Sequence, residues 1–229
     1  MPTLTGVFGQ RSYEYWCRSM KFRIQVADRR VKVAFVFVVI AVLLVIRWIL
    51  QSFAAEPEIA LVYGEQWEEM RQRSSAVISP AIPNESWFRM RKSDARLRFI
   101  DPKYGFVTPL ARFFTIGFTN GKVRDIQMSP QVEPLLLDDA LKVVLDLQDQ
   151  WRQQGWFVSS PRSDPPMSDT PEGRNRVRGI LGGRTFWQAE EKYQIMLMLN
   201  RFQDDKRPNE ERYLISLSLS EPWIPRDED

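Results

Sequence analysis

The chain has 229 residues, with 32 Lys and Arg against 29 Asp and Glu, one Cys and no His. Apolar residues make up 44% of it and aromatic residues 12%, which excludes a disordered chain, a collagen and a disulfide-stabilised scaffold. The absence of His excludes Ser-His-Asp and Cys-His catalysis, His-ligated zinc and imidazole-based pH switching.

Positive charge is concentrated in the first 32 residues, which hold seven basic and two acidic side chains. Residues 51–229 carry 24 basic and 27 acidic side chains, so the larger part of the chain is slightly acidic. The overall charge of +3 therefore belongs to the N-terminal tail, and it does not favour nucleic-acid binding by the rest of the chain.

An unbroken apolar run extends from residue 33 to residue 46. As a helix this run covers roughly 21 Å, whereas the hydrocarbon core of a bilayer is about 30 Å thick. A membrane span therefore has to continue through Arg47 to about Phe53, with the Arg47 side chain extending toward the interface. On this basis we predict a single-pass transmembrane helix over residues 33–53, in contact with the lipid bilayer.

The charges on either side of the apolar run differ in sign. The basic tail precedes the run, and Glu56 and Glu58 follow it, which predicts a cytoplasmic tail over residues 1–32 and an exported C-terminal part. Cys17 lies in the tail, so the exported part has no disulfide. Together these features predict a bacterial inner-membrane protein whose C-terminal domain is periplasmic.

The sequence leaves alternatives to a permanent anchor open. The apolar run has the length of a secretory signal, and Ser52-Phe53-Ala54 is an acceptable cleavage site. A buried core helix is a second alternative, although the run has no polar face. Whether translation starts at Met1 or Met20, and what the tail does, are also open.

Residues 54–83 are predicted to form a juxtamembrane helix and a linker. Pro57 suits the first turn of a helix, and apolar residues recur from Ile59 to Val77 at spacings of three, four and seven. The Pro-rich residues 79–83 end this helix. The helix would serve as a stalk, as a packed helix of the domain or as a dimer seam.

Residues 84–229 are predicted to form one α+β domain. From residue 94 apolar and polar residues alternate, which is typical of strands, and Asn120-Gly121 is a strong signal for a two-residue hairpin turn. A wide apolar stripe with helical spacing predicts a helix over residues 134–154.

The last third of the chain is expected to complete the sheet. Residues 159–175 are rich in Ser, Pro, Asp and Gly and are predicted to be a surface loop. Two segments of regular alternation, 193–199 and 213–219, predict the final strands. The expected fold is an antiparallel sheet of five or six strands packed on one or two helices, with an exposed edge open to strand addition.

Pairs of adjacent carboxylates are the remaining catalytic resource. They are Glu68-Glu69, Asp138-Asp139, Glu190-Glu191 and Asp204-Asp205. A glycosidase needs two carboxyl groups about 5 to 9.5 Å apart across a cleft, and adjacent side chains point in different directions. No serine-hydrolase, phosphate-loop or calcium-loop motif is present. We therefore predict no catalytic residue, no metal ligand and no cofactor.

Basic side chains are the most suggestive polar feature of the domain. They form two sets with few acidic neighbours, which suit an anionic surface or an acidic protein, and two Trp residues in Pro-flanked stretches are candidate interface anchors. The alternative is that the charges form a solvated strand face. The predicted binding residues are Trp87, Arg89, Arg91, Lys92, Arg96, Arg98, Arg174, Arg176, Arg178 and Trp223.

These observations favour a membrane-anchored periplasmic module that binds another protein and is not an enzyme. Two roles fit: an immunity or inhibitor protein against an envelope-targeting toxin, or a subunit of an envelope complex for secretion or division. The expected partner is another envelope or secreted protein, with no nucleic acid and with homo-oligomerisation left open. The alternatives are a membrane-tethered hydrolase that uses carboxylates and a binder of anionic lipid or glycan.

Overall fold

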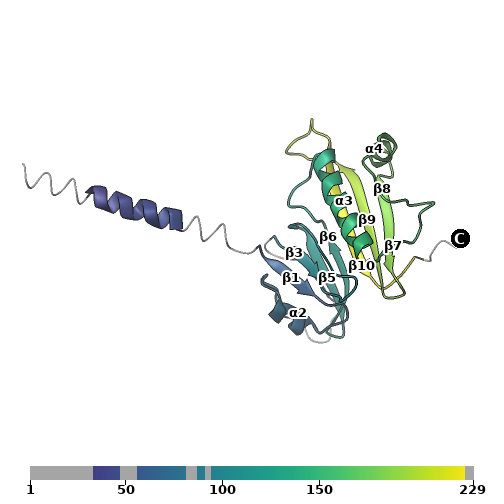
Figure 1. The fold of residues 1–229 in the computed structure, drawn as a ribbon, viewed down its shortest axis with the longest axis horizontal. Coiled ribbons are helices and arrows are strands. Elements are labelled where there is room, and N and C mark those ends of the chain that lie inside the picture. Colours follow the sequence, from purple (N-terminus) through teal and green to yellow (C-terminus); the bar gives the residue numbers. More distant parts are fainter. Residues whose placement is uncertain (1–32, 47–55, 81–86, 91–93, 225–229) are drawn as a thin grey trace, which may run out of the picture. The chain divides into compact units, whose positions relative to one another are not determined.

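The structure, a computed structural model, describes residues 33–46, 56–80, 87–90 and 94–224, with the backbone alone for 87–90 (Figure 1). The chain divides into two compact units, residues 1–55 and residues 56–229. In the first unit the described residues form a helix over 33–46, and its apolar side chains are exposed.

This helix does not match the predicted membrane span. Its described part is fourteen residues long, which covers only about two thirds of a bilayer core, and residues 47–53 lie outside the described residues. Within the described ranges, no helix combines the length and the apolar character that crossing a membrane requires. The finding contradicts the predicted transmembrane helix over 33–53, the single-pass topology, and the inner-membrane and periplasmic location derived from them.

A small sheet of three strands, in the order β1-β3-β4, opens the second unit. Strand β1 (Glu58–Leu61) pairs in parallel with β3 (Arg96–Phe99), and β3 pairs antiparallel with β4 (Phe106–Val107). A short helix, α2 (Trp67–Arg73), follows β1. The unit begins at residue 56, so residues 56–80 belong to it.

The predicted helix over residues 57–77 is therefore wrong for most of its length. Ile59 and Leu61 are fully buried in the small sheet, and the turn at Gly64, where φ is +77°, separates them from α2. The spacing of the apolar residues misled the prediction because a buried strand and a buried helix segment both give a short apolar run.

The large sheet is antiparallel and has seven strands in the order β2-β5-β6-β10-β9-β8-β7. This confirms the α+β content, while the strand number exceeds the expected five or six. The hairpin at Asn120 and Gly121 is also confirmed, with φ values of 53° and 75°. The strands are β2 (Trp87–Met90), β5 (Phe114–Thr119), β6 (Lys122–Met128), β7 (Phe157–Val158), β8 (Gly183–Ala189), β9 (Tyr193–Phe202) and β10 (Arg212–Ser220).

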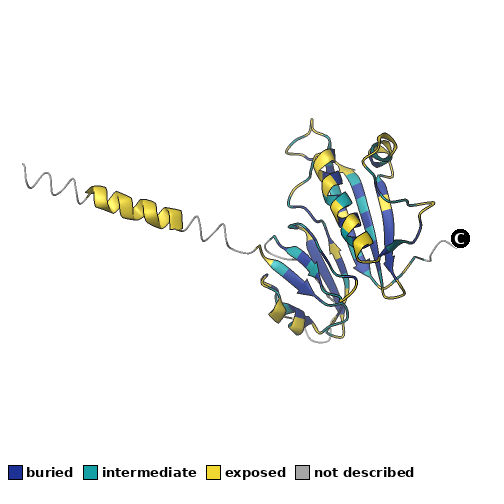
Figure 2. Ribbon diagram, in the orientation of Figure 1, coloured by how far each residue is buried: buried dark blue, intermediate teal, exposed yellow. Residues whose placement is uncertain are grey.

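Helix α3 (Leu137–Gln153) covers one face of the large sheet (Figure 1). The β10 residues beneath it are Tyr213, Ile215, Leu217 and Leu219, all buried, whereas the intervening residues are partly or fully exposed (Figure 2). A further helix, α4 (Pro171–Arg178), contacts β8 and β9, although part of it was expected to be loop. We call the face of the large sheet opposite α3 the open face.

An aromatic cluster joins the small sheet to the large one. The ring of Tyr193 on β9 lies 5.2 Å from that of Phe99 on β3, 5.5 Å from Tyr63 and 6.2 Å from Trp156. Its hydroxyl donates to Asp101 Oδ2 at 3.1 Å. Both sheets therefore share one core on the α3 side.

Glutamine side chains bind backbone groups in several places where a strand partner is missing. The amide of Gln150 donates to the Val107 carbonyl and accepts from the Val107 N–H, both at 3.0 Å, which closes the edge of β4. Gln131 does the same for β10, because it donates to the Tyr213 carbonyl at 3.1 Å and accepts from the Ile215 N–H at 2.8 Å. The Gln131 amide thus pairs the buried Ile215 N–H and adds a second donor to the Tyr213 carbonyl, which also accepts from the Leu135 N–H at 3.0 Å.

We expect Gln131→Leu to lower the free energy of unfolding by about 1 to 3 kcal/mol, because it leaves the buried Ile215 N–H unpaired, while the Tyr213 carbonyl keeps its bond from the Leu135 N–H at 3.0 Å. Urea denaturation measures this change. Gln127→Leu, at an exposed position of β6, is the matched control and should change the stability by less than about 0.5 kcal/mol. Equal effects of the two substitutions would contradict the role of the Gln131 amide.

Burial and the bond to Asp101 raise the pKa of Tyr193 to about 12. The neutral phenol is therefore favoured in the folded state, so its contribution to stability is complete below the unfolded pKa of 10.0 and is lost as the pH rises toward 12. Urea denaturation between pH 9 and pH 12 should show this decline, and Tyr193→Phe should make it shallower. An unchanged slope in the variant would contradict the assignment.

Candidate functional site

The first set of predicted basic residues is divided between β3 and residues outside the described ranges. Arg96 pairs with Glu56 at 2.9 Å and Arg98 with Glu58 at 2.6 Å, because the parallel pairing of β1 and β3 brings acidic side chains beside basic ones. These two side chains are therefore not a free anionic-ligand site. Arg91 and Lys92 lie outside the described residues, and so do the side chains of Trp87 and Arg89.

The second set lies on α4, and the structure pairs each of its side chains locally. Arg174 forms ion pairs with Asp138, at 2.6 Å, and with Asp169. Arg178 lies 3.4 Å from Glu211, and Arg176 donates to the Pro165 carbonyl at 2.8 Å. Asp169 lies five residues before Arg174, whereas Asp138 and Glu211 come from other segments of the chain, so the local sequence did not reveal these two pairs.

Trp223 lies at the C-terminal end of the described chain, against the open face. Its backbone N–H donates to Gln194 Oε1 at 3.1 Å, and its ring meets that of Phe186 edge-on at 6.4 Å. The ring is 41% exposed, so it keeps the accessibility that an interface anchor needs. The structure does not bring it together with the basic residues on α4.

At least one carboxylate of each adjacent pair is engaged in a contact of its own. Asp139 pairs with Lys142 and Glu190 with Lys103, both at 2.9 Å, while Asp204 accepts from the Lys206 N–H at 3.0 Å. Among the described residues, no three Asp, Glu or Cys side chains are grouped as metal binding would require.

Helix α4 directly precedes the most exposed large apolar residues among those described in the second unit. Thr170 caps its N-terminus by accepting from the Gly173 N–H at 3.1 Å, and Pro171 begins its first turn. Within α4, Val177 is the one buried residue, and it packs where a side chain on Gly183 would approach it to 3.1 Å. The contact between Val177 and Gly183 therefore packs α4 against β8.

A tight turn follows α4 and presents two aliphatic side chains to solvent. Ile180 is fully exposed and Leu181 is 88% exposed, and we call this pair the apolar tip. The turn is closed by a bond from the Gly182 N–H to the Gly179 carbonyl at 3.1 Å. Gly182 has a φ of +65°, and a Cβ there would lie 2.0 Å from Asn200 Oδ1, so glycine is required at this position.

The sequence contains a signal for this tip, although the tip is not among the predicted binding residues. Ile180 and Leu181 lie between Gly179 and Gly182. The two large aliphatic residues between them follow neither helical nor strand periodicity, and they stand in a polar stretch. An apolar pair without periodicity between glycines is typical of an exposed turn, and its exposure becomes evident only in the folded chain.

Two hollows lie near this end of the large sheet. The first, about 360 Å³, adjoins α4, and we call it the α4 hollow. Its lining residues are Leu136, Leu137, Asp138, Arg174, Arg178, Glu210 and Glu211. The second, about 330 Å³, we call the sheet hollow; its lining residues are Arg112, Phe113, Ser129, Gln131, Val132, Glu133, Pro134, Leu214 and Ser216.

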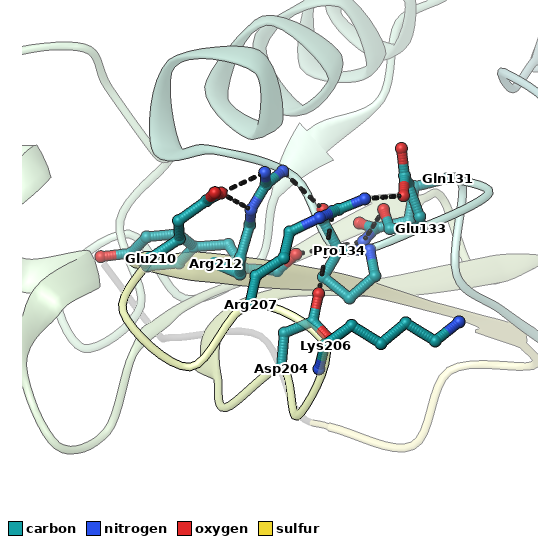
Figure 3. A network of polar contacts seen from close by, with 9 residues as sticks. Gln131, Glu133, Pro134, Asp204, Lys206, Arg207, Glu210 and Arg212 are labelled. Atoms are coloured by element: carbon teal, nitrogen blue, oxygen red, sulfur yellow. Dashed lines mark hydrogen bonds and ion pairs between the residues drawn. The ribbon is translucent and has the colours of Figure 1, made fainter.

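A polar network holds the chain segment that separates the two hollows (Figure 3). Arg212 donates to the Pro134 carbonyl at 3.1 Å and to Glu210 at 2.9 Å. Arg207 donates to Glu133 Oε2 at 2.6 Å, and this guanidinium lowers the pKa of the Glu133 carboxyl. Gln131 is also bonded to β10. The segment that lines both hollows is therefore held by Arg207, Arg212 and β10, so the hollows are formed before any ligand binds.

Comparison with known proteins gives no relative for this chain. No family model matches it, and neither the curated proteins nor the solved structures include a significant match. Known families therefore give no support to the predicted immunity role or the predicted periplasmic location.

We expect Val177→Ala to loosen α4 without unfolding the sheet, because it removes the buried contact of this helix with β8. Hydrogen exchange followed by mass spectrometry should show lower protection in residues 171–182 and unchanged protection in β9 and β10. Equal loss of protection throughout the domain would show instead that Val177 is part of the global core.

Proposed function

We propose that residues 56–229 form a non-catalytic protein-binding domain and that the apolar tip is its main contact with a partner protein. The observation that carries this proposal is the full exposure of Ile180 and the 88% exposure of Leu181 on a glycine turn. Burying a side chain of this size is worth about 1.5 to 3 kcal/mol, so a partner pocket that takes both gains a large part of its affinity from two residues.

The rigidity of the tip supports a role in recognition. The turn is constrained by the bond between Gly182 and Gly179 and by the contact of Gly182 with β9, and the capped helix α4 precedes it. Little conformational entropy is then lost on binding, which favours affinity. The adjoining α4 hollow adds Leu136, which is 46% exposed, as a second apolar contact close to the same helix.

The charges around the tip favour a protein over an anionic lipid or glycan. Arg174, Arg178 and Arg184 are paired with acidic side chains, at 2.6, 3.4 and 2.7 Å respectively. An anionic surface would have to compete with these internal partners, whereas an apolar pocket with a polar rim leaves them intact. The expected partner surface is therefore apolar at its centre and close to neutral at its rim.

The carboxylates give less support to a hydrolase. The adjacent acids considered as catalytic pairs bind Arg174, Lys142, Lys103 or backbone N–H groups in separate places. The α4 hollow is lined by Asp138, Glu210 and Glu211, and these carboxylates are paired with Arg174, Arg212 and Arg178 respectively. The binding function accounts for more of the described surface.

We expect the double substitution Ile180→Asp and Leu181→Asp to abolish partner binding while leaving the thermal unfolding midpoint unchanged, because both side chains are exposed. The measurement is quantitative crosslinking and mass spectrometry on cells that express the full chain or the variant.

Val77→Asp is the matched control, since Val77 is 85% exposed but lies far from the tip in the sequence. Proteins crosslinked to the wild-type chain should be lost in the tip variant and retained in the Val77 variant. The proposal is wrong if the tip variant keeps the same crosslinked proteins at the same yield.

A further inference from the structure

Residues 168–182, which contain α4 and the apolar tip, leave the domain and rejoin it at neighbouring points, and we call them the α4 lobe. Met167 precedes the lobe, and its N–H and carbonyl are both bonded to the Gln148 amide at 2.9 Å. Gly183 follows the lobe as the first residue of β8, and a Cβ there would lie 3.2 Å from Met167 Sδ. A surface segment whose two ends adjoin is an Ω-type loop, a class that is frequently functional. Such a lobe can move as one unit while both of its attachment points stay in place.

Little apolar surface holds the α4 lobe on the rest of the domain. All residues of the lobe are described, and Val177 is the only one among them that is buried. Arg176 adds one neutral contact, because it donates to the Pro165 carbonyl at 2.8 Å in the segment that leads into the lobe. An eight-residue helix such as α4 is not stable by itself in water, and elements with few buried apolar contacts open most readily. The position of the lobe therefore depends on further contacts.

Ion pairs to two other elements supply these contacts. Arg174 Nη1 lies 2.6 Å from Asp138 Oδ1 in the first turn of α3. Arg178 Nε lies 3.4 Å from Glu211 Oε1, directly before β10. Arg174 also pairs with Asp169 inside the lobe, which orients its guanidinium. Both pairs line the α4 hollow, so one wall of this hollow belongs to the lobe and the other to α3 and the start of β10.

The two ion pairs are open to solvent, which makes them sensitive to salt. The side chain of Asp138 is 68% exposed and that of Arg178 is 44% exposed. Exposed ion pairs are screened by salt, because the Debye length falls from about 10 Å at 0.1 M to about 3 Å at 1 M ionic strength. The burial of Val177 involves no charge and is not screened. The equilibrium between the closed lobe and an opened lobe therefore depends on ionic strength.

We propose that the α4 lobe is a movable element that the ion pairs of Arg174 and Arg178 hold closed, and that its opening regulates the apolar tip. In the closed lobe the tip has one fixed position, which lowers the entropy lost on binding. In the opened lobe the tip moves with α4 and loses this advantage, so a partner binds it more weakly. The regulatory part of this inference rests on the proposed function, whereas the opening of the lobe is a property of the domain alone.

Hydrogen exchange of the full chain, followed by mass spectrometry, tests the opening without any partner. Raising NaCl from about 0.1 M to about 1 M should increase amide exchange in residues 168–182 by about two- to fivefold, the effect of losing an exposed ion pair. Exchange in β9 and β10 should stay unchanged, because their bonds lie in the core of the sheet. Asp138→Asn should increase exchange of the lobe already at the lower salt concentration and reduce the further increase that salt causes.

Asp139→Asn is the matched control for Asp138→Asn. Both acids lie in the first turn of α3, so both substitutions change the charge at this helix end equally, but Asp139 pairs with Lys142 within α3 at 2.9 Å. The control should exchange like the wild-type chain in the lobe at both salt concentrations. The inference is overturned if salt leaves exchange of the lobe unchanged, if β9 and β10 respond to the same degree, or if the two variants behave alike.

Crosslinking in cells, as described for the tip variant, tests the regulatory part. Asp138→Asn should lower the yield of the proteins whose crosslinking depends on the tip, without abolishing it, and Asp139→Asn should leave the yield unchanged. An unchanged yield in Asp138→Asn, together with an opened lobe, would overturn the regulatory part. If instead the tip variant keeps its crosslinked proteins, the proposed function fails, and the exchange measurements still decide whether the lobe opens.

Discussion

The irregular parts of this domain depend on glutamine side chains that pair with backbone groups. The Gln148 amide donates to the Met167 carbonyl and accepts from the Met167 N–H, both at 2.9 Å, and Met167 lies under Gly183 beside α4. Gln131 holds the wall of the sheet hollow, and Gln194 binds the chain at Ile224. Without these amides the segments around the candidate site would have buried N–H and carbonyl groups and no strand to satisfy them.

The distribution of packing between the two faces of the large sheet explains where the candidate contacts lie. Helix α3 and the small sheet share one face, where Tyr193 and Trp151 belong to a single aromatic and aliphatic core. The other face mixes polar and apolar residues, since Ser216 and Ser218 of β10 pair there with Met198 and Met196 of β9. The apolar tip follows α4 and precedes β8 of the same sheet, so the proposed contact is on a part of the domain that its own core does not use.

The sequence correctly predicted those elements that have a regular apolar pattern or a turn motif within consecutive residues. The helix now seen at Leu137–Gln153, the turn at Asn120 and Gly121, and the strands β9 and β10 follow from periodicity and turn chemistry over a few adjacent residues. Strand β1 was mistaken for a helix, because parallel pairing with β3 is a contact across nearly forty residues that a local pattern does not contain. The predicted membrane span is contradicted because no helix within the described residues is long and apolar enough to cross a membrane.

The sequence by itself determined the class of the domain, the acidic character of its larger part and the absence of histidine chemistry, since these follow from composition and short-range spacing. Only the tertiary structure decided which charges are free. The Arg residues of α4 looked unpaired along the chain, yet Asp138 and Glu211 reach them from other elements, while Asp125, unremarked in the sequence, has an oxygen without a partner. The physical reason is that ion pairing and desolvation depend on distance in space, and folding brings together charges that the sequence keeps far apart.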